Sequence, residues 1–166
     1  MADGDRAFEC LELISRACLG TNFLTYHNDW RRQGITLDMR WGRRAPLQLD
    51  ANMGWTAAVQ EMLLYSKPGF IKLIPALPKK WSRGTISGLQ CRGGVTVSLR
   101  WDLPEGRVFV SCESNEQQIL TVALPRRIRF SETSLLLRPH PQSDRFGHPE
   151  LPAGEPVNLT IVLEPE

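Results

Sequence analysis

The stretch VTVSLRWDLPEGRVFVSC, residues 95–112, decides the fold class. Apolar residues at positions 95, 97 and 99 alternate with polar ones, and a second apolar run, Val108–Cys112, follows the triplet Pro104-Glu105-Gly106. Alternation with a period of two is typical of a strand that buries one face, and Pro and Gly between two such runs favour a turn. The segment therefore predicts two strands of a half-buried β-sheet.

Further short strands are predicted after this stretch. They are rich in branched residues and bounded by Pro, Gly or charged residues: Ile119–Leu124, Leu135–Leu137 and Val157–Leu163. Because no helical pattern separates them, they favour an antiparallel β-sandwich. The segment Arg138–Pro156 holds five prolines and is predicted to be one long loop.

Before Gly69 the apolar period is 3.6 residues, which predicts two helices, Asp5–Cys18 and Trp55–Ser66. The second ends at Lys67-Pro68-Gly69, which cannot continue a helix. Two helices are too few to close a helical core. We therefore expect their apolar faces to pack on missing partners or on the sandwich, and the chain to be a fragment or one end of a larger enzyme.

Composition excludes several classes of function. The 166 residues are 42% hydrophobic and 23% charged with a net charge of +2, which is ordinary for a globular domain and too weakly basic to favour nucleic acid as a partner. No apolar run is long enough to span a membrane, and the first residues lack the features of a signal peptide, so the localisation stays open. The four cysteines form no CxxC pair, and His140 and His148 lack metal-ligand spacing. We expect no metal and no cofactor.

One motif carries a family resemblance. The segment PLQLDANMGWTAA, residues 46–58, is followed by QEMLL at 60–64, and further matches are IKLIPALP at 71–78 and Arg92-Gly93-Gly94. These motifs, in this order, resemble the C-terminal part of glycoside hydrolase family 95, whose pattern reads P-F-Q-I-D-x-N-F-G-x-T-A-A and then E-M-L-L. Members are mostly α-L-fucosidases, and some act on α-L-galactosides. The resemblance covers about residues 4–101.

The resemblance implies an α+β organisation, because the family has a six-hairpin α/α barrel followed by a C-terminal β domain. Residues 1–68 would then be the last helices of the barrel, and residues 69–166 an antiparallel β-sandwich domain. The change of apolar period near Gly69 agrees with this division.

The resemblance also implies a catalytic role for Asp50. Inverting glycoside hydrolysis needs a general acid and a base that activates water on the opposite face of the sugar. In this family the acid is a glutamate in an earlier part of the barrel, and asparagine side chains polarised by an aspartate hold the water. Asp50 matches that aspartate; from spacing alone, it could instead be a residue that caps the helix start. We expect its carboxyl to face an open hollow where helices and sandwich meet.

Three further residues are candidates for substrate binding: His27, Gln48 and Asn52. Asn52 is also a capping candidate. The family often has its histidine just before the aspartate, in H-P-P-F-Q-I-D, whereas His27 lies 23 positions before Asp50. The intervening insertion, Asn28–Ala45, holds Trp and Arg residues that suit either sugar recognition or a solvated loop, so the sugar specificity stays open.

The leading interpretation is the C-terminal portion of an inverting glycoside hydrolase that cleaves terminal α-L-fucosyl or related α-L-galactosyl linkages and is inactive as the isolated chain. Its partners would be a glycoside or oligosaccharide substrate and the rest of the barrel, with neither nucleic acid nor membrane. The alternative is a non-catalytic β-sandwich that binds carbohydrate or protein, or a structural lid that acts in trans. Few strand aromatics, among them Trp101 and Phe109, argue against a flat stacking platform.

Overall fold

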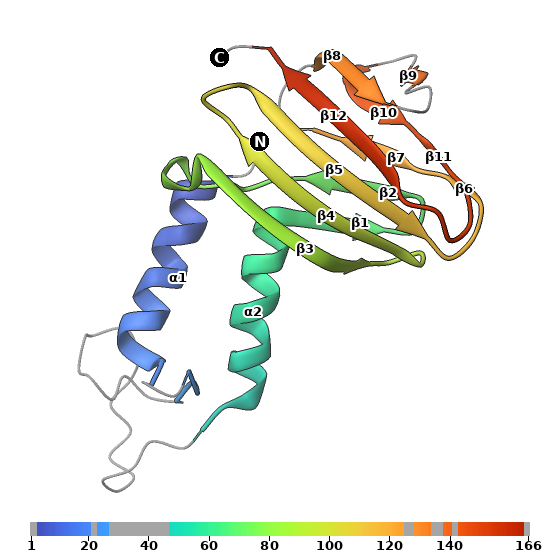
Figure 1. Ribbon diagram of the computed structural model, residues 1–166. Helices are drawn as coiled ribbons and strands as arrows, with labels where there is room; N and C mark the ends of the chain where they lie inside the picture. The colour runs from blue at the N-terminus through green and yellow to red at the C-terminus, as the bar shows by residue number, and fades with distance from the viewer. Residues whose placement is uncertain are drawn as a thin grey trace, which may run out of the picture.

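The computed structural model describes residues 3–20, 23–26, 47–124, 128–133, 138–140 and 143–164. Two helices, α1 (Gly4–Cys18) and α2 (Leu49–Leu63), lie side by side and project from one side of a β-sandwich (Figure 1). The strands are β1 (Leu64–Lys67), β2 (Phe70–Leu73), β3 (Arg83–Cys91), β4 (Val95–Asp102), β5 (Arg107–Ser114), β6 (Gln118–Ile119), β7 (Thr121–Ala123), β8 (Ile128–Thr133), β9 (Arg138–His140), β10 (Ser143–His148), β11 (Glu150–Leu151) and β12 (Val157–Leu163). A short 3-10 helix, η1 (Lys79–Trp81), precedes β3.

The start of α1 is fixed by local chemistry and by a close contact with the sandwich domain. The Asp3 side chain caps the helix by accepting a hydrogen bond from the backbone N–H of Arg6 at 3.0 Å. Gly4 is buried, and a Cβ there would stand 2.4 Å from the carbonyl oxygen of Leu77. Only a glycine therefore lets α1 approach the segment before η1 this closely.

The second helix begins and ends earlier than Trp55–Ser66, the range that the sequence predicts. It begins at Leu49, so Asp50 lies in its first turn, where a carboxylate interacts favourably with the helix dipole. It ends at Leu63 because residues 64–67 pair with residues 70–73 as the antiparallel hairpin β1–β2. Gly69, with φ of 72°, makes that hairpin's turn possible. Long-range strand pairing thus overrides the helical pattern in the last turn.

Two five-stranded sheets pack face to face, in the orders β1-β2-β7-β10-β9 and β3-β4-β5-β12-β8, and β11 pairs with β6 beside them. The predicted α+β class with a mostly antiparallel sandwich is confirmed; the pair β2–β7 is parallel. Alternate residues of each sheet meet in one core, as Ile71 and Val122 of the first sheet and Val97 and Ile161 of the second show, all at most 1% exposed. The proposed division into residues 1–68 and 69–166 stays a prediction.

The prediction of one long loop over Arg138–Pro156 is wrong. The segment contains β9, β10 and β11, which pair with β10, β7 and β6. Proline is tolerated in edge strands and at the first residue of a strand. A proline-rich segment can therefore form strands where its other residues have backbone hydrogen-bond partners. The predicted strand Ile119–Leu124 is divided between β6 and β7, which belong to different sheets, and Leu135–Leu137 lies outside the described residues.

Among the described helices, none combines the length and the apolar composition that a bilayer crossing requires. The helices instead pack on the sandwich through aromatic side chains. Trp101 of β4 is 5% exposed, and its indole N–H donates to the carbonyl oxygen of Trp81 at 2.7 Å. The Trp81 ring in turn meets the Phe8 ring of α1 edge to face, with centroids 5.2 Å apart. These contacts link the inner face of β4 to α1 through η1.

Replacing Gly84 by alanine tests the close approach of the Trp101 ring to the backbone of β3. A Cβ at Gly84 would stand 2.3 Å from Trp101 Cζ2. We expect Gly84→Ala to lower the free energy of unfolding by about 1–3 kcal/mol, as overpacking of a core does. Gly54→Ala is the matched control, because nothing lies within 4 Å of a Cβ there and alanine should stabilise α2 by about 0.5–1 kcal/mol. Equal effects of the two changes in urea denaturation would contradict this packing.

Two buried thiols give the domain a pH dependence. Burial raises the pKa of Cys91 to about 11 although a hydrogen bond with Ser66 lowers it, and burial together with the charge of Cys91 raises the pKa of Cys112 to about 12. Above the ordinary thiol pKa, the unfolded chain loses protons that the native chain keeps. The native state is therefore progressively disfavoured as pH rises from about 9 to about 12.

We therefore expect the free energy of unfolding to fall between pH 8.5 and 10.5, and to fall less steeply in Cys112→Ala. Denaturation curves at the two pH values measure this, and an identical slope in the variant would contradict the assignment. In the native protein at pH 8, Cys10 should react with Ellman's reagent well before Cys91 and Cys112, because it is exposed and they are buried.

Candidate functional site

Asp50 lies at the end of α2 that points away from the sandwich (Figure 1). It is the second residue of the helix and its side chain is exposed. A helix of 15 residues is about 22 Å long, and the other end of α2 leads directly into β1. The position therefore differs from the expected one, because Asp50 is a helix length away from the boundary between helices and sandwich.

Asn52 holds the segment after α1 against the start of α2. Its Oδ1 accepts hydrogen bonds from the Thr25 backbone N–H at 2.6 Å and from the Thr25 hydroxyl at 2.8 Å. Its Nδ2 donates to the carbonyl oxygen of Phe23 at 2.7 Å. Both the oxygen and the nitrogen of the Asn52 amide are therefore hydrogen-bonded to Thr25 and Phe23, which lie 27 and 29 positions earlier in the chain.

Gln48 takes part in the same arrangement through its backbone. Its N–H donates to the Thr25 carbonyl at 2.9 Å, and its carbonyl oxygen lies 2.5 Å from the Thr25 hydroxyl, which shares its one hydrogen between this carbonyl and Asn52 Oδ1. Thr25 is 1% exposed, so these bonds satisfy a buried hydroxyl. The side chain of Gln48 is half-buried. Gln48, Asp50 and Asn52 thus lie together at one end of the helix pair.

The fourth candidate, His27, lies outside the described residues, and so does the insertion Asn28–Ala45. The segment Phe23–Tyr26 and Leu47 flank that insertion, and an isolated bridge joins Tyr26 to Leu47. The described residues therefore bring both ends of the insertion to the same end of the helix pair as Asp50. The assignments of His27, Gln48, Asp50 and Asn52 stay predictions.

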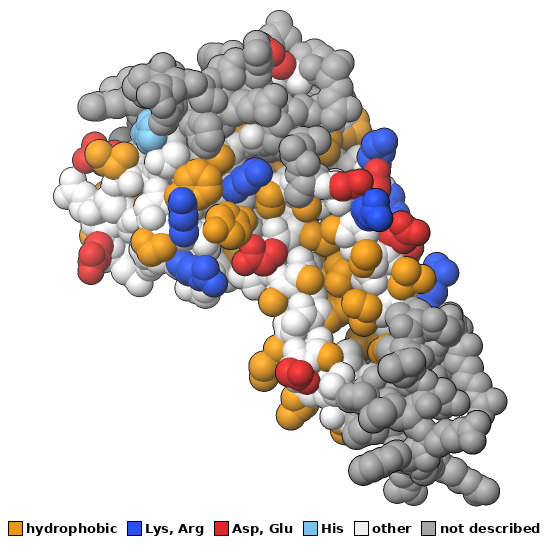
Figure 2. Space-filling view, turned by 180° about the vertical axis from the view of Figure 1, so that it is seen from behind, with side chains coloured by type: hydrophobic (Ala, Val, Ile, Leu, Met, Phe, Trp, Pro, Cys, Tyr) orange, Lys and Arg blue, Asp and Glu red, His pale blue; other side chains and the backbone are white. Residues whose placement is uncertain are grey.

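Large apolar side chains are exposed along the helices and at this end of them. Figure 2 shows hydrophobic side chains gathered over the helical part of the molecule. Those more than a third exposed are Leu13, Ile14, Phe23, Leu47, Leu49 and Met53. Clustered exposed apolar residues of this kind mark contact surfaces.

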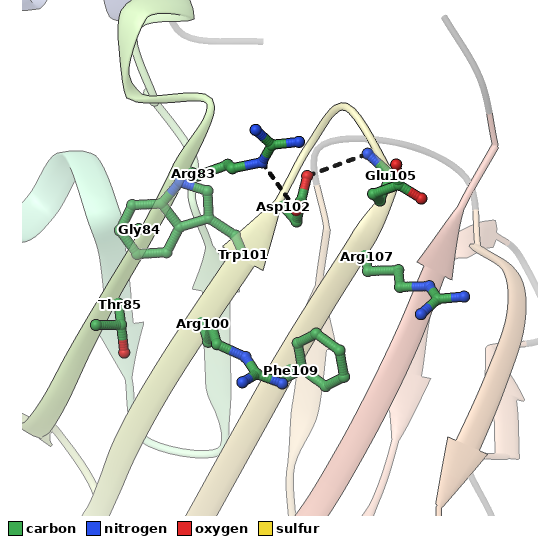
Figure 3. A pocket seen from close by; sticks show the side chains of 9 residues that line it. All are labelled: Arg83, Gly84, Thr85, Arg100, Trp101, Asp102, Glu105, Arg107 and Phe109. Carbon is green, nitrogen blue, oxygen red and sulfur yellow. Dashed lines mark hydrogen bonds and ion pairs between the residues drawn. The ribbon is translucent and has the colours of Figure 1, made fainter.

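A hollow of about 540 Å³ lies over the outer face of β3, β4 and β5 (Figure 3). Its lining residues are Arg83, Gly84, Thr85, Arg100, Trp101, Asp102, Glu105, Arg107 and Phe109. The Arg100 guanidinium carbon stands 4.1 Å from the centroid of the Phe109 ring. These arginines are not among the site residues predicted from the sequence, although Arg100 and Arg107 lie at polar positions of the predicted strands in residues 95–112.

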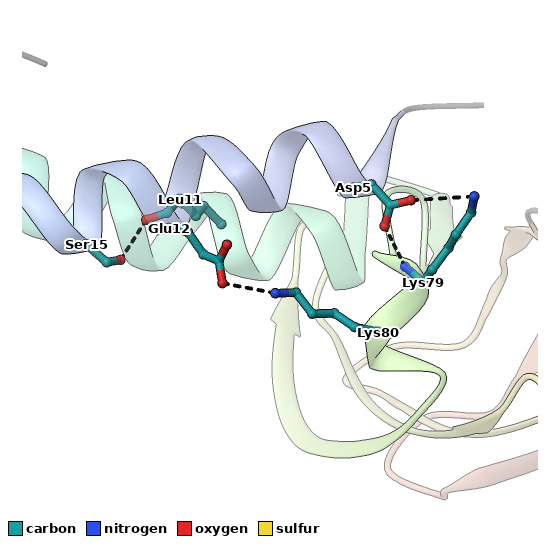
Figure 4. Close-up of polar contacts among 6 residues, drawn as sticks. All are labelled: Asp5, Leu11, Glu12, Ser15, Lys79 and Lys80. Carbon is teal, nitrogen blue, oxygen red and sulfur yellow. Dashed lines mark hydrogen bonds and ion pairs between the residues drawn. The ribbon is translucent and has the colours of Figure 1, made fainter.

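A second hollow, about 370 Å³, lies between α1, α2 and η1 and is mostly apolar, with Phe8, Trp55 and Trp81 in its lining. Its polar groups are already engaged: the Trp55 indole N–H donates to Ser15 Oγ at 3.0 Å, and Ser15 donates to the Leu11 carbonyl. Figure 4 shows the two ion pairs that join α1 to η1, Asp5–Lys79 and Glu12–Lys80; Ser15 lies farther along α1, past Glu12. This hollow offers packing surface and no reactive group.

Neither hollow includes Asp50 in its lining. In the described part of the chain, no three His, Cys, Asp or Glu side chains come together in a way that could hold a metal ion. The chemistry that the described residues offer is therefore a solvent-facing carboxylate beside an amide-held segment, and a separate arginine-rich hollow on the sandwich.

Comparison with known proteins confirms the family resemblance. Residues 65–144 match the model of the glycoside hydrolase family 95, C-terminal domain. Similar curated proteins include Alpha-L-fucosidase 2 of Arabidopsis thaliana, 54% identical over 57 residues, which are 34% of this chain and 7% of that protein. Two proteins named Probable alpha-fucosidase A are also similar. The Aspergillus oryzae protein is 37% identical over 65 residues (33% of this chain, 9% of that protein), and the Aspergillus niger protein is 33% identical over 81 residues (42% and 10%).

The chain therefore matches at most a tenth of the length of these relatives. The family match itself is confined to residues 65–144, which resemble the glycoside hydrolase family 95, C-terminal domain.

Replacing Asn52 tests its structural contribution. Asn52→Ala leaves the Thr25 backbone N–H without its acceptor, whereas the Thr25 hydroxyl keeps the Gln48 carbonyl, so we expect the free energy of unfolding to fall by about 1–3 kcal/mol. Hydrogen exchange should also show the Thr25 amide exchanging faster. Asn158→Ala, at an exposed position of β12, is the control and should change stability by less than about 0.5 kcal/mol. Unchanged exchange at Thr25 in the first variant would show that Asn52 does not hold this segment.

Proposed function

We propose that this chain is the C-terminal portion of an inverting glycoside hydrolase that removes terminal α-L-fucosyl, or related α-L-galactosyl, units from oligosaccharides. The observation that carries the proposal is the matched family domain, together with the motif around Asp50 that precedes it. Three relatives whose names contain fucosidase support the sugar class. The reaction itself would take place in a barrel to which this chain contributes its last helices.

In this proposal Asp50 is the residue that acts on the attacking water, through an asparagine amide. A carboxylate that accepts a hydrogen bond from an amide N–H polarises the amide, and the amide oxygen then holds and orients the water more strongly. Asp50 suits this role because it is exposed and no hydrogen bond or ion pair to other described residues engages its side chain.

The amide that orients the water is not that of Asn52 in this proposal. Both polar atoms of the Asn52 side chain already bond to Phe23 and Thr25. Its Oδ1 accepts two hydrogen bonds, so neither lone pair is left to accept one from the attacking water. Asn52 instead acts as a positioning residue that ties the segment before the insertion to the helix carrying Asp50. The asparagine that holds the water would come from another part of the barrel.

The partner that the helices require is the remainder of that barrel. The exposed apolar residues on α1 and α2 fit a helix pair that packs against further helices, and burial of each would contribute about 1.5–3 kcal/mol. The isolated chain is therefore expected to show no turnover of an aryl α-L-fucoside, because the family's general acid belongs to an earlier part of the barrel.

The test is Asp50→Asn in the longer protein that contains this chain. We expect kcat on an aryl α-L-fucoside to fall at least about 100-fold with little change in KM, since the change removes an interaction of the transition state. Glu61→Gln, at an exposed position of the same helix, is the matched control and should leave kcat within twofold. Circular dichroism checks the fold of both. Hydrolysis by Asp50→Asn within threefold of the parent would exclude the role.

A further inference from the structure

The hollow on the outer face of β3, β4 and β5 carries chemistry that the proposed hydrolysis does not use. Its volume of about 540 Å³ falls within the roughly 300–1,000 Å³ that small-molecule sites occupy. It is built on three paired strands, so its side chains stand on a rigid surface. Asp50 is not part of it, and the inference below does not depend on Asp50 being catalytic.

Strand register places two arginines as diagonal neighbours on this face. Arg100 pairs with Phe109, and Asp102 pairs with Arg107, across the β4–β5 ladder. Cross-strand diagonal neighbours are about 7–8 Å apart, within reach of long side chains. The two guanidinium groups can therefore approach one ligand group from two sides.

The Arg100 guanidinium is held flat against an aromatic ring. It lies 4.1 Å from the Phe109 centroid, and Figure 3 shows the two side chains together. Stacking of this kind fixes the plane of the guanidinium while its N–H groups still point outward. Among the side chains that the structure describes, no carboxylate forms an ion pair within 4 Å with Arg100 or Arg107. Both are therefore available to an anion.

The remaining charges of the hollow limit what it can bind. Arg83 is neutralised by Asp102, whose Oδ2 lies 2.9 Å from the Arg83 Nε, and Asp102 Oδ1 also accepts from the Glu105 backbone N–H at 3.2 Å. The Glu105 carboxylate remains as an acceptor at the edge of the same hollow. Three arginines and two acids leave a formal excess of one positive charge.

We propose that this hollow is a binding site for an anionic sugar, that is, a pyranose unit carrying a single carboxylate or sulfate group. Arg100 and Arg107 would bind the anionic group, since arginine suits the planar, bidentate recognition of such groups. Glu105 and the Thr85 hydroxyl, which also lines the hollow, would bind sugar hydroxyls. The edges of Phe109 that Arg100 leaves uncovered offer apolar contact to the C–H face of the ring.

The charge balance separates this ligand from its alternatives. A nucleic acid or polyphosphate brings several negative charges, more than the hollow can balance beside the Glu105 carboxylate, whereas a net excess of one positive charge matches one anionic group. A neutral glycan would leave two guanidinium groups without a counter-charge. The mixture of guanidinium, carboxylate and hydroxyl groups fits a polyol with one negative charge.

The experiment is calorimetric titration of the chain at 50 mM salt with four probes: galacturonate, its methyl ester, galactose 6-sulfate and sodium acetate. We expect galacturonate or galactose 6-sulfate to bind at least tenfold more tightly than the methyl ester and acetate. The tighter of the two charged sugars identifies the anionic group. Binding of the ester as tight as that of the charged sugars, or of acetate as tight as both, would overturn the proposal, as would the absence of binding at 10 mM.

Variants assign the binding to this hollow. Arg100→Gln and Arg107→Gln should each weaken the better charged sugar about tenfold or more. Arg92→Gln, which removes an arginine at an exposed position outside the hollow, is the matched control and should stay within twofold. Equal losses in all three would indicate attraction by net charge alone and would overturn the site. Because these residues are exposed or half-buried on the outer face, thermal melts of the variants should stay close to the parent's.

Discussion

The hydrogen bond from the Trp101 indole to the Trp81 carbonyl, 2.7 Å long, is the contact on which the placement of the helices depends. It joins a residue of the sandwich core to the short helix η1, and the Trp81 ring then packs against Phe8 of α1. This contact requires a glycine at position 84 of β3, because the Trp101 indole occupies the space that a side chain there would fill. The helix pair is thereby anchored at the end nearest the sandwich, and the opposite end depends on the bonds between Asn52 and Thr25.

In the function proposed above, this anchoring would make the β domain the support of the helix that carries Asp50. The sandwich buries its own core and contacts the start of α1 and the end of α2. It therefore fixes the distance between the two helices, and their direction, at the end of the helix pair nearest the sandwich. Ile74 N–H donates to the Leu63 carbonyl at 2.7 Å, which ties the last turn of α2 to the strand segment. The exposed carboxylate of Asp50 then projects from a helix whose far end is fixed. Precise placement of a reacting group requires such support.

Sequence patterns predicted the elements whose energetics are local and missed those decided by distant partners. The α1 range was right within a residue because its cap and its apolar spacing both lie inside the helix. The end of α2 was wrong because Leu64–Lys67 gains more from pairing with Phe70–Leu73 than from another helical turn. The strands after residue 138 were missed since their partners lie in β7 and β6, and the distance of Asp50 from the sandwich follows from the full length of α2. No local pattern contains those partners.

The arginine-rich hollow was missed for a related reason. Arg100 and Arg107 each read as a solvated residue on the polar side of a strand, and the sequence alone does not show that the β4–β5 register makes them neighbours. A shift of that register by one residue would move Arg107 to the core face. The burial of Val108 and Val110 opposes such a shift, because it would expose both side chains. The same apolar alternation that builds the sandwich therefore holds two guanidinium groups on one outer surface. A group of charges held in register by a buried core retains its geometry whether or not the barrel is present, so the hollow's chemistry belongs to the sandwich alone.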